Sequence, residues 1–111
     1  MSVTFEIQGS LLIVDLLGRL DSANSALVEG SLLERVTATD GPVLLDLARL
    51  DYISSAGLRV VLVVAKRMKQ AGRALVLCGL QPNIRDVFEI SGFLTILDVA
   101  GKRAEAIARL R

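Results

Sequence analysis

The stretch DYISSAGLRVVL, residues 51–62, decides how this chain is organised. A short strand-like run ends there and a strongly apolar run with helical spacing begins, with two serines, Ala56 and Gly57 at the junction. Serine is common at a helix start because its hydroxyl accepts a hydrogen bond from a free backbone N–H. The pattern predicts a strand-to-helix connection and raises the question of why hydroxyl groups stand at it.

Strand and helix patterns alternate outward from this junction. They predict the order β-β-α-β-α-β-α-β-α, with strands over 3–8, 11–18, 42–50, 73–80 and 94–99 and helices within 19–41, 58–72, 81–93 and 100–111. This order predicts an α/β fold with a mixed sheet of four to five strands and about four helices. A capping signal at Asp21 and Ser22 starts the first helix, whose residues Val28, Leu32 and Val36 face the core.

The composition describes one globular domain, residues 1–111. Apolar residues make up 52% and aromatic residues only 4%, so aliphatic side chains must build the core. A net charge of +1 gives little electrostatic reason to bind nucleic acid or an anionic membrane. The first residues do not resemble a signal peptide, and no apolar run approaches the roughly 18 residues of a membrane span. We expect a cytoplasmic protein that does not insert into a membrane.

The sequence contains no candidate residues for a conventional catalytic site. The chain has no histidine and one cysteine, Cys78, whose apolar neighbours predict a buried, structural thiol. A Ser-His-Asp triad and a zinc site of Cys and His are therefore excluded. No phosphate-binding loop or dinucleotide fingerprint is present either. We expect the chain to have no catalytic residues and to bind no metal ion or cofactor. It is predicted not to be an enzyme.

Two interpretations of the role of the serine pair remain open. In the first, Ser54 or Ser55 only caps the helix. In the second, a serine is phosphorylated, because the first turn of a helix offers free N–H groups and the positive end of its dipole. Ala56 and Gly57 would leave room for another molecule, at the carboxyl edge of the sheet where ligands usually bind. Asp21 stands at an equivalent junction and could lie beside Ser55.

Three segments resemble the STAS-domain family, specifically the bacterial anti-sigma factor antagonists. They are LDYISSAGLRVVL (residues 50–62), GRLDSANS (18–25) and LCGLQPNIRDVFEISGF (77–93). The resemblance implies that Ser55 accepts a phosphate, with Ser54 as the alternative, and that Asp21 belongs to a region that contacts the kinase. Ser54 stands where these relatives carry an aspartate, and Ala56 stands where they carry Ser or Thr.

The resemblance implies a partner-switching function. The unphosphorylated form would bind an anti-sigma factor that is also a serine kinase, phosphorylation would release it, and a serine phosphatase would reverse the reaction. ATP and Mg²⁺ would belong to the kinase. The residues expected to bind the partner are Asp21, Ser22, Ser54, Ser55, Ala56, Gly57, Leu58 and Arg59.

Two other hypotheses remain open. The chain could be a non-switching STAS subunit of a larger assembly, such as a stress-sensing scaffold or a lipid-transport complex, in which the serines only cap a helix. An enzyme or nucleotide-binding protein of flavodoxin-like topology is disfavoured by the missing phosphate loop.

Overall fold

A long hairpin opens the chain, whose computed structural model describes residues 1–110. Strand β1 (Ser2–Gln8) pairs antiparallel with β2 (Leu11–Leu20). Gly9 turns the chain between them with a φ of +62°, a conformation that glycine adopts without steric cost. The hairpin confirms the prediction made from the alternating residues of the N-terminal segment.

Parallel strands extend the sheet from β2. They are β3 (Val43–Asp46), β4 (Leu50–Ile53), β5 (Leu75–Cys78) and β6 (Val99–Ala100). The order is β1-β2-β3-β5-β6, and β4 also pairs with β2. Because β2 is ten residues long, β3 pairs with its first half and β4 with its last residues. The α/β fold and the order of its elements are confirmed, with β4 as an additional strand.

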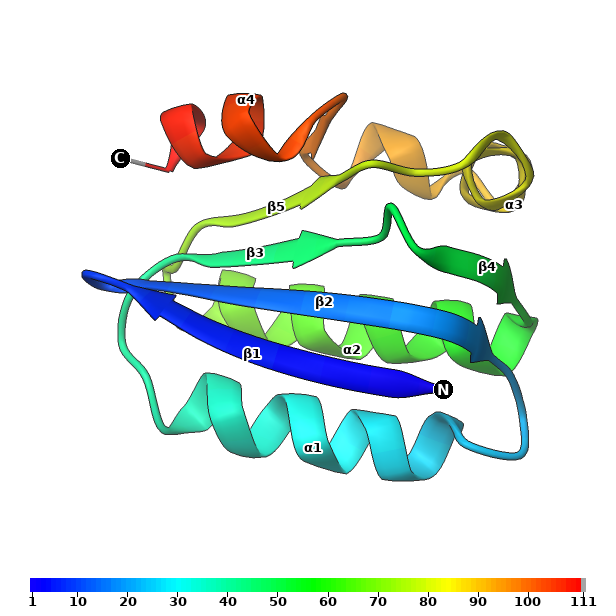
Figure 1. The fold of residues 1–111 in the computed structure, drawn as a ribbon, viewed down its shortest axis with the longest axis horizontal. Helices are drawn as coiled ribbons and strands as arrows, with labels where there is room; N and C mark the ends of the chain where they lie inside the picture. Colours follow the sequence, from blue (N-terminus) through cyan, green and yellow to red (C-terminus); the bar gives the residue numbers. More distant parts are fainter. Residues whose placement is uncertain (111) are drawn as a thin grey trace.

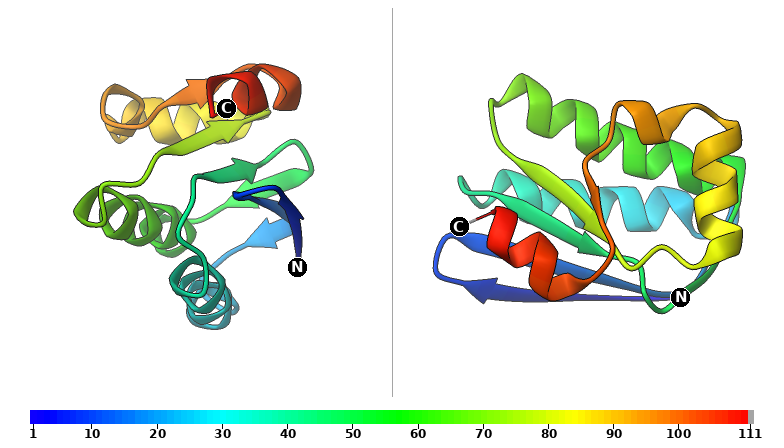
Figure 2. Two further views of the ribbon diagram at one scale, coloured as in Figure 1. Left: turned by 90° about the vertical axis from the view of Figure 1, so that its left-hand side faces the viewer. Right: turned by 90° about the horizontal axis from the view of Figure 1, so that it is seen from above.

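Helices cover both faces of the sheet (Figures 1 and 2). They are α1 (Ser25–Thr37), α2 (Ser55–Gln70), α3 (Pro82–Ile90) and α4 (Arg103–Arg109). Helices α1 and α2 lie side by side on one face, whereas α4 covers the other (Figure 2). Neighbouring residues of a strand point to opposite faces, so Leu12 and Val14 join the core under α1 and α2, and Leu11 and Ile13 join the one under α4.

Two predicted boundaries are wrong. The first helix begins at Ser25 and not at Asp21 or Ser22, because the side chain of Asp21 bonds within the preceding loop. The strand predicted over 94–99 is only β6, Val99–Ala100. Before it, Gly92 turns the chain with a φ of +79° into the short 3₁₀ helix η1 (Phe93–Thr95), which interrupts the extended run.

Arg103 anchors α4 to the sheet. Its guanidinium Nη1 donates to Asp15 Oδ1 at 2.9 Å and to Asp46 Oδ2 at 3.0 Å. Asp46 is only 6% exposed, and its other oxygen accepts the backbone N–H of Ala48. Burial alone would lower the pKa of Arg103, but hydrogen bonds to Asp46 and Asp15 outweigh it and raise the pKa overall. The buried carboxylate thus depends on one cation from α4.

Cys78 lies beside this cluster, and its predicted burial is confirmed. Burial, assisted by the negative charge of Asp46, raises the pKa of the Cys78 thiol to about 12. A thiol with such a pKa stays protonated at neutral pH and is a poor nucleophile. Its role is therefore structural.

Replacement of Arg103 by glutamine should destabilise the fold by about 1 to 3 kcal/mol, because it leaves the Asp46 carboxylate buried without a cation. Urea unfolding measures the change. Arg109→Gln is the matched control on the same helix, since Asp98 and Glu105, the partners of Arg109, are half exposed, and such pairs contribute less than about 1 kcal/mol. Equal losses in the two variants would contradict the anchoring role of Arg103.

Candidate functional site

The predicted site residues meet where β2 and β4 end. Leu20 of β2 lies opposite Ile53 of β4 in parallel register, so Asp21 and Ser54 follow these strands at neighbouring positions. The backbone N–H of Ser54 donates to the carbonyl oxygen of Leu20 at 2.9 Å. The start of α2 and the loop before α1 therefore lie at the same end of the molecule (Figure 1).

The two serines have different structural roles. Ser54 is the N-cap of α2, and its Oγ accepts the backbone N–H of Gly57 at 3.1 Å. Ser55 is the first residue of the helix and is exposed. Within residues 1–110 its hydroxyl makes no hydrogen bond to a side chain or backbone group. The sequence left the cap open between the two serines, and the structure assigns it to Ser54.

Gly57 is buried against the end of β2. A Cβ atom there would lie 2.7 Å from the carbonyl oxygen of Leu20 and 3.0 Å from Cγ1 of Ile53. The interpretation that Gly57 leaves room for another molecule is therefore wrong, because the protein itself fills that space. Leu58 is buried as well. Of the predicted partner-binding set, the residues with side chains at least partly accessible are Asp21, Ser22, Ser54, Ser55, Ala56 and Arg59.

Asn24 organises the loop before α1, a role that the sequence did not reveal. Its Oδ1 accepts the backbone N–H of Asp21 at 3.0 Å, and its Nδ2 donates to the carbonyl oxygen of Arg19 at 2.8 Å. Asp21 Oδ1 in turn accepts the backbone N–H of Ala23. The structure contains no hydrogen bond from Ser55 to Asp21, so this carboxylate shapes its own loop.

Gln81, the N-cap of α3, and Asn83 in its first turn support β4 through Asp51. Gln81 Nε2 donates to Asp51 Oδ1 at 3.3 Å, and Asn83 Nδ2 donates to the carbonyl oxygen of Asp51 at 2.8 Å. The sequence pattern predicted a helix within 81–93 but not these contacts with Asp51. On the outer side of β4, the guanidinium of Arg19 lies 4.1 Å from the centroid of the Tyr52 ring. These contacts hold the strand that leads into Ser54.

This arrangement presents a hydroxyl group and does not activate one. Ser55 stands at the positive end of the α2 dipole, and no acidic residue lies in the first turn of the helix. Among the described residues, no group of three or more cysteine and acidic side chains could hold a metal ion. The site can offer a hydroxyl to the active centre of another protein and can stabilise added negative charge.

Residues 2–106 match the family described as the STAS domain. The chain belongs to the STAS family. It is 50% identical over 111 residues to BtrV of Bordetella bronchiseptica, a candidate anti-sigma factor antagonist, with 100% of this chain and 96% of the relative covered. It is 26% identical to the anti-sigma F factor antagonist of Paenibacillus polymyxa, covering 99% of this chain and 95% of that protein.

Solved structures share the fold of this STAS domain. The phosphorylated form of the Bacillus protein SpoIIAA superposes with a TM-score of 0.76 at 21% identity, covering 99% of this chain and 100% of the other. A domain of the murine anion transporter Slc26a9 superposes with a TM-score of 0.78 at 15% identity, covering 95% of this chain and 18% of the transporter. In the described part of the present chain, no helix has the length and apolar character needed to cross a membrane.

Replacement of Gly57 by alanine should destabilise the protein by about 1 to 3 kcal/mol, because the new methyl group meets the backbone of Leu20. Chemical denaturation measures this loss. Gly30→Ala is the matched control, since a Cβ at that helical position meets nothing within 4 Å and should stabilise α1 by up to about 1 kcal/mol. A neutral or stabilising Gly57→Ala change would contradict the close contact of α2 with β2.

The two serines should also differ in their effect on stability. Ser54→Ala removes the cap and should lower the free energy of unfolding by about 1 kcal/mol. Ser55→Ala should leave it within about 0.5 kcal/mol of wild type, because that hydroxyl has no partner in the fold. Thermal unfolding of the two single variants tests the assignment, and a larger loss for Ser55→Ala would reverse it.

Proposed function

We propose that this STAS domain is an anti-sigma factor antagonist, and that phosphorylation of Ser55 switches off its binding to an anti-sigma factor serine kinase. The observation that carries the proposal is the division of roles between the two serines. Ser54 Oγ is engaged with the Gly57 amide, whereas Ser55 is exposed at the helix start with a free hydroxyl. A kinase could reach Ser55 without disturbing the cap.

The surroundings of Ser55 support a switch that leaves the fold unchanged. A phosphate on Ser55 would stand at the N-terminus of a sixteen-residue helix, where the dipole and free N–H groups favour negative charge. The same dianion would be unfavourable in a partner interface that had been formed around a neutral hydroxyl. An affinity change of a thousandfold requires about 4 kcal/mol, and unpaired interface charge costs energy of that order.

The relatives support the same function. The chain is similar over its whole length to proteins named as anti-sigma factor antagonists. It is 50% identical to BtrV and 26% identical to the Paenibacillus polymyxa protein. ATP and Mg²⁺ would be supplied by the kinase, so the chain itself would need no catalytic group. A serine phosphatase would restore the binding form. Asp21, Ser22, Ala56 and Arg59 would surround Ser55 in the interface with the kinase.

The decisive experiment incubates the protein with ATP, Mg²⁺ and a candidate anti-sigma factor serine kinase. We expect mass spectrometry to place one phosphate on Ser55 and none on the Ser55→Ala variant. Binding of the kinase, measured by calorimetry, should weaken at least tenfold in Ser55→Asp. Ser54→Ala is the control, because loss of the cap should not abolish phosphorylation at the neighbouring residue.

Two results would overturn the proposal. A phosphate found on Ser54 would move the switch to the capping residue and refute the role of Ser55. If neither serine is modified and Ser55→Asp binds the kinase like wild type, the chain is a non-switching STAS subunit of a larger assembly. The fold of the Slc26a9 domain is an example of this architecture within a much longer protein.

A further inference from the structure

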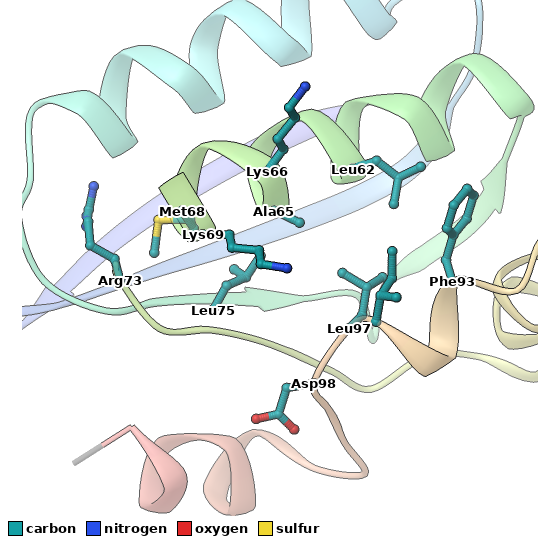
Figure 3. A pocket seen from close by; sticks show the side chains of 11 residues that line it. Leu62, Ala65, Lys66, Met68, Lys69, Arg73, Leu75, Phe93, Leu97 and Asp98 are labelled. Atoms are coloured by element: carbon teal, nitrogen blue, oxygen red, sulfur yellow. The ribbon is translucent and has the colours of Figure 1, made fainter. Parts of the chain in front are cut away.

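A groove lies along the second half of α2, away from the Ser55 site. It is bounded by α2 on one side and by the segment from η1 to β6 on the other, with β5 between them (Figure 3). Its volume is about 520 Å³. Lys69, which lines it, is fourteen positions after Ser55 on the same helix, a separation of about 20 Å along the helix axis. A ligand in this groove would not touch the proposed phosphorylation site.

The walls of the groove are apolar. Leu62 of α2 and Phe93 of η1 lie on opposite walls of the groove, and Leu97 also lines it (Figure 3). Ile96, which also lines the groove, is 71% exposed. The groove therefore offers apolar surface from two separate elements that a hydrocarbon chain could cover at once.

One cation of the lining turns into the groove. The ammonium group of Lys69 lies in the gap between α2 and the opposite wall, whereas the charged ends of Lys66 and Arg73 point away from it (Figure 3). Within residues 1–110 neither lysine forms an ion pair. The guanidinium of Arg73 donates to the carbonyl oxygens of residues 36 and 41 and to the hydroxyl of residue 39, so its charge is used at the end of α1 and not in the groove.

The single acidic residue of the lining, Asp98, is directed away from the gap. Its carboxylate lies on the side of the groove toward α4, where it shares Arg109 with Glu105 (Figure 3). The charge that turns into the gap is that of Lys69, and it stands next to apolar walls. This combination is complementary to a molecule with an anionic head and a short hydrocarbon tail.

We propose that this groove binds a medium-chain fatty acid, with its carboxylate at Lys69 and its chain between Leu62, Phe93 and Leu97. The volume falls within the range of small-molecule sites, about 300 to 1,000 Å³. A groove of this size is smaller than the extended surface needed to seat an amphipathic helix of a partner protein. One lysine that turns into a recessed apolar gap also suits one carboxylate better than a flat anionic bilayer.

Titration of the ¹⁵N-labelled protein with sodium decanoate, below its micelle concentration, tests the proposal. We expect saturable amide shifts at Leu62, Phe93 and Leu97 and none at Ser55. Decanoate should bind more tightly than octanoate, by up to about fourfold for each additional methylene group that is buried. Decyltrimethylammonium, with the same chain and the opposite charge, should bind at least fivefold more weakly.

Variants separate the roles of charge and apolar surface. Lys69→Gln should weaken decanoate binding at least fivefold, and Ala65→Leu should weaken it by filling the groove. Lys102→Gln is the matched control, because Lys102 is exposed before α4 and does not line the groove, and it should bind like wild type. Circular dichroism verifies that each variant is folded.

Three outcomes would overturn the proposal. They are the absence of saturable shifts, equal binding by wild type and Lys69→Gln, and binding to phosphatidylglycerol vesicles without binding to monomeric decanoate. The last result would assign the surface to a membrane. None of them bears on phosphorylation of Ser55, so this site and the proposed partner switch can fail independently.

Discussion

The contact between Gly57 and Leu20 fixes the positions of the serine pair and the Asp21 loop. Both lie at the same end of this STAS domain. Only a residue without a side chain lets the first turn of α2 approach the carbonyl oxygen of Leu20 so closely. The amide of Ser54 bonds to that same oxygen. One backbone carbonyl thus joins the end of β2 to the start of α2, and it determines where the serine pair and the Asp21 loop lie relative to each other.

This contact is one of several that hold the start of α2 in place. The helix start is held by a side-chain cap, by pairing of β4 with β2 and by Gln81 and Asn83 from α3. Ser55, in contrast, is exposed and has no partner in the described structure. Under the proposed function, this rigid backbone would let a kinase bind the free hydroxyl at little cost in conformational entropy.

Much of the fold could be read from the sequence because periodic apolar patterns reflect burial on one face of each element. The hairpin, the parallel strands and the buried residues Val28, Leu32 and Val36 are confirmed. Local patterns failed where side chains bond within a loop, as at Asp21 and Asn24. They also failed at β4, because its pairing depends on the unusual length of β2.

The sequence by itself determined that this is an α/β domain without histidine, with two serines at a strand-to-helix junction. It determined those features because composition, residue spacing and helix-capping preferences are local properties of the chain. Only the tertiary structure decided which serine is the cap, why residue 57 must be glycine and that Arg103 compensates the buried Asp46. Those answers depend on distances between residues far apart in the sequence, which no local pattern contains.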